Sequence, residues 1–317
     1  KIFYFVYKMN LLYCFDRNYN RQAFISISSF IEQNHSNLNI YIIHEDPSTF
    51  EFYEKKLLEK VNINLKVYRF QKPNNISLPF KDSDHVSEAT YYRLFIENYL
   101  ESDLTEILYI DVDVICLKNI EDIYLETIQR LNESKMCIAA KPSGEKGGGS
   151  LDFDKFLNSL NIDSTYFQAG VMFINLDVWK KLNFSENLIS KLIEIRDSIV
   201  FWDQDVLNSL VNGSFLPIQE SLNYISNNTN NLDNIMDQAY LLHYAGSKKP
   251  WTISGGVNSV ANFYHELNLK IMKSYHIEYS YKRVEFINLI KMILNREILQ
   301  LKSPIRYIMR SLINIIK

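Results

Sequence analysis

Apolar and polar residues alternate along the first seventy or so positions with a period that changes from segment to segment. Short apolar runs predict strands at 10–15, 38–44 and 65–70, while 21–33 and 50–62 repeat their apolar residues every three or four positions, as helices do. Strands that alternate with helices indicate a largely parallel sheet covered on both faces. In such sheets ligands bind beyond the carboxyl ends of the strands.

Further along the chain the pattern is less regular but still marks elements. It predicts helices at 89–99 and 203–212 and strands at 106–114, 168–176 and 241–244. A glycine cluster at 147–149, in a chain with only 9 glycines, predicts a surface loop over 144–150.

The segment from residue 281 onward has a different charge balance. Its basic side chains outnumber its two acidic ones, Glu285 and Glu297, and apolar residues recur between them at helical spacing. Pro304 is expected to separate two helices. A basic amphipathic helix can lie in an anionic membrane surface, whereas packing on the protein's own core or a dimer contact is the alternative. We expect a main domain over 1–265 and a basic amphipathic helical tail over 266–317.

Composition narrows the class of protein. The 317 residues are 47% hydrophobic and 22% charged, which is ordinary for a globular chain, and the net charge of −3 argues against a general nucleic-acid binder. The three cysteines are far apart and form no C-x-x-C pair, which favours reduced thiols in a cytosolic compartment. No apolar stretch is long enough to predict a transmembrane helix.

The strand at 106–114 carries Asp111-Val112-Asp113 near its end. Side chains two apart along a strand point the same way, so two carboxylates are expected on one side of the strand end. Two such oxygen ligands suit Mg²⁺ or Mn²⁺, and a metal held this way suits a ligand with phosphates. A solvated strand terminus is the alternative, because short motifs often occur by chance.

Other short segments accompany this motif in a fixed order. They are Asp16-Arg17-Asn18-Tyr19, Thr90-Tyr91-Tyr92-Arg93-Leu94, the run from Phe167 to Leu176 that contains Gln168-Ala169-Gly170, Trp202-Asp203-Gln204-Asp205-Val206-Leu207-Asn208 and His243-Tyr244-Ala245-Gly246-Ser247-Lys248-Lys249-Pro250-Trp251. The series resembles glycosyltransferase family 8, which holds bacterial lipooligosaccharide galactosyl- and glucosyltransferases and glycogenin. The resemblance covers about residues 9–255. It implies a GT-A fold, an α/β architecture with a Rossmann-like nucleotide half, a mixed, mainly parallel central sheet and an acceptor half.

The resemblance assigns a metal site. It implies that Asp111, Asp113 and His243 bind Mn²⁺, with Mg²⁺ as the alternative, and that Val112 belongs to the same donor-binding motif. Two carboxylates and an imidazole suit Mn²⁺ better than Ca²⁺. The metal would stabilise the charge on the leaving UDP.

The resemblance also assigns contacts to the nucleotide sugar. Gly246 would let the backbone approach the diphosphate, Lys249 would add a charge there, and Arg93 would reach a phosphate or sugar hydroxyl. The alternative for Gly246 and Lys249 is a surface turn, and the alternative for Arg93 is a surface ion pair on a helix.

The segment after the first strand would hold the base. Tyr19 would stack on the uracil, while Asp16 and Asn18 would bond its edge. The alternative for these two residues is a helix N-cap or Asx turn, and both uses are compatible.

Asp203 and Gln204 are implied to contact the donor sugar and to act in catalysis. An amide is a poor nucleophile, so we favour attack by the acceptor hydroxyl on the same face, with Gln204 stabilising the oxocarbenium-like centre. Asp205 is the competing candidate, and an acidic helix N-terminus is the structural alternative. Gln168 stands where many family members have Asn, which leaves the sugar open, and Lys141 suggests an acidic acceptor.

We therefore expect a metal-dependent, retaining glycosyltransferase that moves galactose or glucose from a UDP-hexose to a lipopolysaccharide, lipooligosaccharide or other surface glycan or glycolipid. Its expected location is the bacterial cytoplasm, at the cytoplasmic face of the inner membrane. The oligomeric state stays open. Two alternatives are a haloacid-dehalogenase-like phosphatase using Asp111 and a catalytically inactive sugar-nucleotide-binding subunit.

Overall fold

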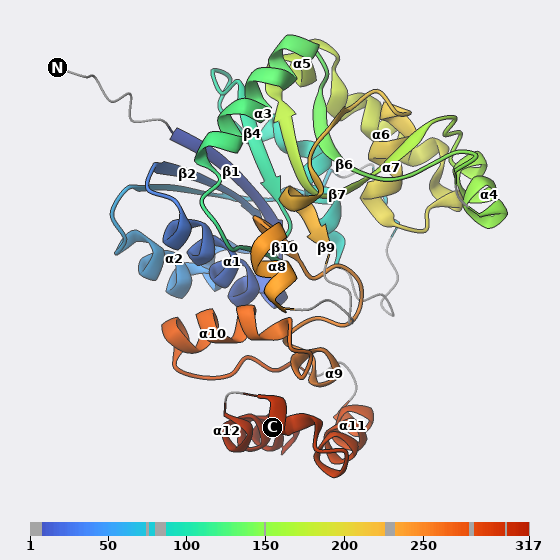
Figure 1. The fold of residues 1–317 in the computed structure, drawn as a ribbon. Helices are drawn as coiled ribbons and strands as arrows, with labels where there is room; N and C mark the ends of the chain where they lie inside the picture. Colours follow the sequence, from blue (N-terminus) through green and yellow to red (C-terminus); the bar gives the residue numbers. More distant parts are fainter. Residues whose placement is uncertain are drawn as a thin grey trace.

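A computed structural model describes residues 8–73, 76–79, 87–148, 150–225, 232–278, 282–301 and 303–316. The central sheet runs through the molecule with helices on both sides, and the C-terminal helices lie at one end, below α9 and α10 in Figure 1. Gly149 of the glycine cluster and the first seven residues lie outside the described part.

The central sheet has seven strands in the order β3-β2-β1-β4-β7-β6-β8. Its strands are β1 (Lys8–Phe15), β2 (Asn37–His44), β3 (Ile63–Arg69), β4 (Glu106–Ile110), β6 (Ile138–Glu145), β7 (Thr165–Asn175) and β8 (Leu216–Pro217). The first four are parallel, whereas β7 is antiparallel to both β4 and β6. The predicted mixed, mainly parallel sheet is confirmed.

A second, three-stranded sheet has the order β5-β10-β9. It consists of β5 (Val114–Cys116), β9 (Tyr224–Ile225) and β10 (Leu241–His243). Strand β10 is antiparallel to β5 and pairs His243 with Val114. This pairing brings the late histidine beside the Asp111–Asp113 segment.

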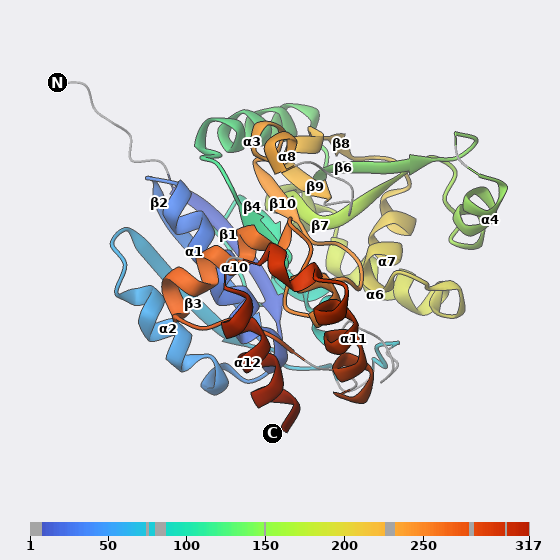
Figure 2. The same ribbon diagram turned by 60° about the horizontal axis from the view of Figure 1, so that its bottom comes forward.

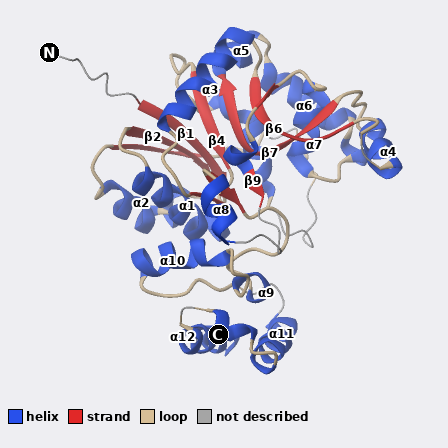
Figure 3. Ribbon diagram, viewed as in Figure 1, coloured by secondary structure: helices blue, strands red, loops and turns tan. Residues whose placement is uncertain are grey.

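Alternate side chains along the strands pack into two hydrophobic cores, one on each face of the sheet. Leu11 and Leu108 pack into one core with α1 (Asn20–Gln33), α2 (Glu51–Leu58) and α3 (Glu121–Ser134). Leu12 and Tyr109 pack into the other with the 3₁₀ helix η3 (Glu88–Asn98), α5 (Leu176–Lys181), α6 (Phe184–Glu194) and α7 (Trp202–Val211). Figure 3 shows these helices on either side of the strands. Successive strand residues face opposite sides, which is why both faces are apolar.

Two predicted elements differ from the structure. The strand expected over 106–114 ends at Ile110, and Asp111 to Asp113 form a turn in which Val114 N donates to Asp111 O at 3.1 Å before β5 begins. The helix expected over 89–99 is a 3₁₀ helix with a non-helical residue at Phe95. The tighter winding is uncommon over so many residues and is more frequent at functional segments.

The remaining helices were not all predicted. Helix α4 (Leu151–Ser159) follows the glycine cluster and begins at the cap Ser150, whose hydroxyl accepts a hydrogen bond from Phe153 N. Strand β6 extends through Gly144 to Glu145, so the loop expected there begins later. Helix α8 (Leu232–Gln238) and α9 (Ile253–Gly256) flank β10 in sequence.

The tail forms two helices, α11 (Lys282–Leu294) and α12 (Pro304–Ile316), joined by the 3₁₀ helix η6 (Glu297–Gln300). The predicted separation at Pro304 is confirmed, because α12 begins there. Helix α10 (Ala261–Met272) runs across position 265, and the division of the chain at that residue stays a prediction. Figure 2 shows α10, α11 and α12 on the same side of the molecule.

The tail has a buried side and an exposed side. Leu289, Met292 and Tyr307 share a small core with Ile253 and Tyr275. The exposed apolar residues of the tail are Val284, Phe286, Ile287, Ile290, Ile293, Leu294, Leu299, Ile305, Met309, Leu312 and Ile313. One side of the tail therefore packs on the protein, and the other presents apolar residues to the surroundings. Attachment of the tail to a membrane stays a prediction.

Candidate active site

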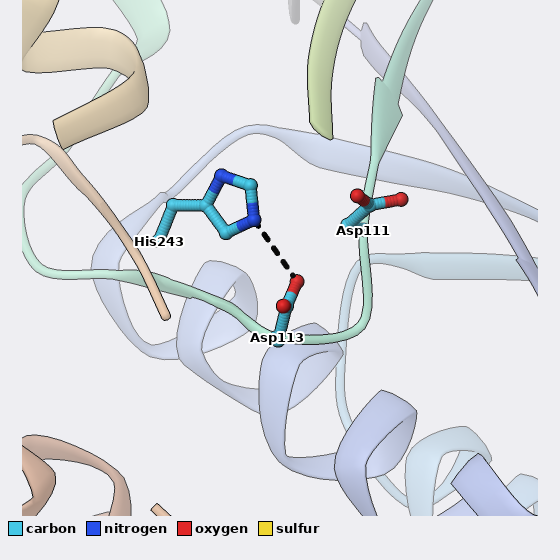
Figure 4. Close-up of side chains that lie close together, drawn as sticks. All are labelled: Asp111, Asp113 and His243. Carbon is cyan, nitrogen blue, oxygen red and sulfur yellow. Dashed lines mark ion pairs between the residues drawn. The ribbon is translucent and has the colours of Figure 1, made fainter. Parts of the chain in front are cut away.

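Three side chains converge where β4 gives way to β5. Oxygen atoms of Asp111 and Asp113 and a ring nitrogen of His243 all lie within 4.8 Å of one another. Figure 4 shows the His243 imidazole directed at the Asp113 carboxylate, with Asp111 at the end of its strand. The carboxylates meet through a turn rather than through strand alternation, so the expected juxtaposition is confirmed but its geometric reason was wrong.

The tautomer of His243 follows from its neighbour. Its Nδ1 lies 2.8 Å from Asn223 Oδ1, while Asn223 Nδ2 donates to Gln168 Oε1 at 2.9 Å. With the Asn223 oxygen accepting, Nδ1 carries the proton, and the lone pair of Nε2 faces the Asp113 carboxylate 3.3 Å away. This is the tautomer that a metal-binding histidine needs.

Asp113 is a buried carboxylate with two different oxygens. Its Oδ1 is buried and receives no hydrogen bond from the described part of the chain, and its Oδ2 forms an ion pair with Lys249. Although burial disfavours the charged form, the Lys249 ammonium holds the pKa of Asp113 well below its ordinary value. Asp113 is therefore ionised at neutral pH, with one oxygen turned toward His243.

Asp111 is held by its own set of donors. Arg93 Nη2 and the Tyr109 hydroxyl both donate to Asp111 Oδ1, at 2.8 and 2.7 Å. The Arg93 guanidinium lies 4.0 Å over the Tyr109 ring and also bonds the Ala169 carbonyl at 2.9 Å. These contacts leave Asp111 Oδ2 as the oxygen nearer the cluster's centre, 3.0 Å from where a Cβ on Gly170 would lie.

Gly170 is required beside the cluster. A Cβ added there would lie 2.3 Å from His243 Cε1, closer than two non-bonded carbons approach. Only glycine lets β7 pass this close to the histidine. Together with the buried Asp113 oxygen and the histidine tautomer, this geometry fits a divalent cation bound by two carboxylates and an imidazole.

The cluster lines one part of a cavity of about 870 Å³. Most of the predicted site residues line it: Tyr19, Arg93, Asp111, Val112, Asp113, Gln168, Asp203, Gln204, His243, Gly246 and Lys249. Asp16 and Asn18 are not among the lining residues. Asp16 caps the 3₁₀ helix η1 (Arg17–Tyr19), where its Oδ1 accepts from Asn18 N at 2.8 Å. The N-cap alternative describes these two residues, while Tyr19 reaches the cavity.

Gly246 adopts φ +85°, a conformation that side chains other than glycine rarely accept. A Cβ there would meet nothing within 4 Å. The backbone is therefore open to the cavity at this point, beside Lys249.

Asp203 and Gln204 stand at the N-terminus of α7. Burial raises the pKa of Asp203 to about 6, although its ion pair with Arg93 at 2.9 Å opposes this shift. The Gln204 amide is fixed at both ends, since Oε1 accepts from Ala169 N at 2.9 Å and Nε2 lies 3.0 Å from the Tyr166 hydroxyl.

Two residues considered from the sequence have other roles. Asp205 is fully buried and accepts hydrogen bonds from the Tyr166 hydroxyl at 2.5 Å and from Val200 N and Phe201 N, each at 2.7 Å. Lys141 forms an ion pair with Glu220 at 2.9 Å and does not line the cavity. Asp205 thus orders a loop, and Lys141 gives no support for an acidic acceptor.

The structure adds residues that sequence reasoning missed. Asn223 orients His243, Gly170 makes room for it, and Tyr109 helps hold Asp111. Tyr109 lies in the strand predicted at 106–114, and Gly170 lies in the segment Gln168-Ala169-Gly170. Both were therefore next to predicted site residues, but no other feature of the sequence indicated their roles. Nothing in the sequence around Asn223 marks it.

Comparisons with known proteins place this chain among glycosyltransferases. A sequence model of glycosyl transferase family 8 matches residues 10–254. The lipopolysaccharide 1,2-glucosyltransferase of Escherichia coli K12 is 30% identical over 257 residues, covering 77% of this chain and 72% of that protein. The lipopolysaccharide 1,3-galactosyltransferase of Salmonella typhimurium LT2 is 27% identical over 274 residues, covering 81% and 77%.

Solved structures share the architecture. The galactosyltransferase LgtC, in complex with donor and acceptor sugar analogs, superposes with a TM-score of 0.63 at 19% identity, covering 87% of this chain and all of that chain. The predicted GT-A fold is confirmed. The dehalogenase-like alternative is wrong, since the family match, the three strands before β4 and the donors on Asp111 all disagree with it.

Proposed function

The chain belongs to glycosyl transferase family 8 and is a glycosyltransferase, and we propose that it transfers galactose or glucose from a UDP-sugar to a lipopolysaccharide or related surface glycan. The observation that supports this most is the Asp111, Asp113 and His243 cluster at one side of a cavity that also holds Lys249, Gly246 and Gln204. The named activities of the two relatives supply the sugar and the acceptor class.

In this proposal Asp111, Asp113 and His243 hold Mn²⁺ or Mg²⁺. Such an ion acts as a Lewis acid toward a diphosphate leaving group. Lys249 and the open backbone at Gly246 bind the diphosphate, and Tyr19 lies against the base. Arg93 and Asp203 form an ion pair in the lining of the cavity, and in this proposal they bind sugar hydroxyls.

We propose that the configuration at the anomeric carbon is retained. The acceptor hydroxyl oxygen forms its bond to that carbon on the face from which the bond to the β-phosphate oxygen breaks, and the hydroxyl proton passes to the departing phosphate oxygen. Gln204 supports this step by its amide dipole, which Ala169 N and the Tyr166 hydroxyl keep in one orientation.

Release of UDP from a panel of UDP-hexoses tests the proposal without an acceptor. We expect UDP release with Mn²⁺ and none with EDTA, and no release from the Asp113→Ala variant under either condition. Full activity of Asp113→Ala in EDTA would contradict it, as would a wild-type chain that hydrolyses no UDP-hexose with Mn²⁺ or Mg²⁺.

We further propose that the tail attaches the enzyme to an anionic membrane surface, at the cytoplasmic face of a bacterial inner membrane. Among the described residues no helix is both long and apolar enough to cross a bilayer. The exposed apolar residues of α11 and α12 lie among basic ones, such as Lys291 and Arg306, a combination that suits an interfacial helix.

Sedimentation with phosphatidylglycerol vesicles tests the tail. Leu294 and Ile305 are 75% and 73% exposed, so Leu294→Glu with Ile305→Glu should abolish binding while leaving UDP release unchanged. Val61→Glu, at an 82% exposed position after α2, is the matched control. Unchanged sedimentation of the double variant would overturn this part of the proposal.

A further inference from the structure

The segment 245–251, which follows β10, contributes several residues to the lining of the cavity, Lys249 among them. The backbone of Lys249 is attached to the next element, α9. Both the amide and the hydroxyl of Thr252 donate to the Lys249 carbonyl oxygen, at 3.0 and 2.8 Å. Thr252 is also the residue that caps α9. The position of the Lys249 backbone is therefore set by the start of this short helix.

Two glycines of α9 allow the helix to pack closely on its neighbours. A Cβ on Gly255 would overlap the Lys249 carbonyl group. A Cβ on Gly256 would lie 3.0 Å from the Pro250 carbonyl oxygen and 2.7 Å from the Tyr307 hydroxyl. These spaces leave no room for an added methyl group. Helix α9 is therefore in direct contact both with the segment that carries Lys249 and with Tyr307 of the tail.

The tail holds α9 through Tyr307, a fully buried residue of α12. Its hydroxyl donates to the Ile253 carbonyl oxygen at 3.2 Å, and the two side chains share one small core with Leu289 of α11. The ring of His265 lies edge-on to that of Tyr307, with centroids 6.3 Å apart. Figure 1 shows α9 between the tail helices and the rest of the molecule. The buried side of the tail thus supports the helix to which Lys249 is attached.

We propose that Tyr307 is a positioning residue of the diphosphate subsite: α12 holds α9, and α9 holds the backbone that presents the Lys249 ammonium. The inference rests on the proposed function, in which Lys249 binds the diphosphate of the donor. A lysine is a point charge on a flexible stem, so its contribution at a phosphate depends on where its backbone is held. Tyr307 is not among the residues that line the cavity and acts through Lys249.

The proposal gives the two sides of the tail separate roles. The exposed side, with Leu294 and Ile305, is the one proposed to contact a membrane, and its substitution leaves donor binding unchanged. The buried side, with Tyr307, serves the donor site whether or not a membrane is present. A purely structural Tyr307 would instead stabilise the tail without distinguishing one ligand from another.

Tyr307→Phe removes the hydroxyl and keeps the ring in the core. UDP and uridine share the base and the ribose, but only UDP carries the diphosphate. With Mn²⁺ present, isothermal titration measures UDP affinity, and competition with UDP measures uridine affinity. We expect UDP to bind about three- to tenfold more weakly and uridine to bind as in the wild type. KM for UDP-hexose hydrolysis should rise by the same factor, with kcat unchanged.

Tyr275→Phe is the matched control. Tyr275 belongs to the same core, its ring lies edge-on to that of Tyr307 at 5.4 Å, and its hydroxyl is hydrogen-bonded to Ser303 of the tail. We expect wild-type affinity of this variant for both UDP and uridine. Thermal unfolding shows whether the two variants are equally folded, so a loss of UDP affinity confined to Tyr307→Phe reports on the contact with α9.

Gly256→Ala tests the same contact from α9. Its Cβ would meet the Tyr307 hydroxyl, so α9 and the Lys249 backbone must shift, and UDP affinity should fall about fivefold or more. Tyr307→Phe removes the atom that this Cβ meets. We therefore expect the double variant to bind UDP at least as well as Gly256→Ala alone, whereas independent effects would multiply. Multiplied losses would contradict the proposed contact.

The remaining outcomes separate this inference from the proposed function. Wild-type UDP affinity in a folded Tyr307→Phe variant, or equal losses of UDP and uridine affinity, would overturn the positioning role and leave the proposed function intact. If the wild-type chain neither binds UDP with Mn²⁺ nor hydrolyses any UDP-hexose, the proposed function fails, and the role of Tyr307 fails with it.

Discussion

Lys249 and Asp113 form an ion pair inside the cluster that is proposed to hold a cation. The Lys249 ammonium contacts Asp113 Oδ2 and donates to the Tyr244 carbonyl at 2.8 Å, while Asp113 Oδ1 faces His243. The lysine thus balances the buried carboxylate when no other cation does so. A diphosphate bound nearby would offer the same ammonium a second anionic partner.

Replacement of Lys249 should have two measurable effects, one on the stability of the metal-free protein and one on its affinity for UDP. In Lys249→Met the buried Asp113 charge loses its partner, so without metal we expect the free energy of unfolding to fall by about 3 kcal/mol. Mn²⁺ should restore part of this loss, and UDP affinity with metal should fall about tenfold or more. Thermal unfolding in EDTA and in Mn²⁺, with UDP titration, measures both effects. Lys248→Met, at an exposed neighbour, is the control; equal behaviour of the two variants would rule out the role given to Lys249.

Gly170→Ala should damage the metal site without removing a ligand. Its new Cβ would collide with His243 Cε1, so the imidazole must rotate away from Asp113 or β7 must shift. Displacing a metal ligand's support commonly costs about 10- to 100-fold in metal affinity. Isothermal titration of Mn²⁺ in the presence of UDP measures the loss, and the far-ultraviolet circular dichroism spectrum checks the fold. Wild-type Mn²⁺ affinity in a folded variant would show that His243 is not held as described.

Asp205→Asn distinguishes a positioning residue from a nucleophile. Asp205 accepts three hydrogen bonds that order Tyr166 and the backbone at Val200 and Phe201. We expect the acceptor KM to rise while UDP-hexose hydrolysis stays within a few-fold of wild type. A nucleophilic Asp205 predicts the opposite, loss of hydrolysis by several orders of magnitude, so the ratio of the two effects decides between the roles.

His265 lies on α10 and faces Tyr307 of the tail. Its imidazole should make the free energy of unfolding depend on pH. Burial lowers the pKa of this imidazole from 6.5 to about 3. Below pH 6.5 the unfolded chain binds the proton and the folded chain does not, so stability falls as the pH falls, by about 1.4 kcal/mol per pH unit from this group. His265→Phe removes that contribution. Urea unfolding at pH 7.5, 6.5 and 5.5 should show a shallower decline for the variant; parallel declines would contradict the assignment.

Much of the site was predictable from the sequence because its chemistry lies in short segments. Asp111-Val112-Asp113 and the segment from His243 to Lys249 each carry several functional residues, and their order matched a family. The strand pattern predicted the parallel half of the sheet, since buried parallel strands are continuous apolar runs.

The rest depends on contacts that the sequence pattern does not record. Asn223 orients His243 only because β9 and β10 are neighbours, and Gly170 matters only because β7 passes the imidazole. The turn at Asp111–Asp113 arises where the chain leaves one sheet for another, which local alternation cannot reveal. The tail has the same limit: spacing predicts an apolar side, but not that Leu289 and Tyr307 pack inward while Ile305 stays exposed.

Asp111, Asp113 and His243 are proposed to bind the divalent cation that contacts the diphosphate of UDP. A crystal grown with MnCl₂ and UDP, measured for anomalous scattering from manganese, tests it most directly. We predict one anomalous peak within bonding distance of an oxygen of each aspartate, of His243 Nε2 and of the UDP diphosphate, with the Lys249 ammonium turned to the phosphates. A manganese peak elsewhere beside UDP, or bound UDP with no manganese and Lys249 still on Asp113, would contradict it.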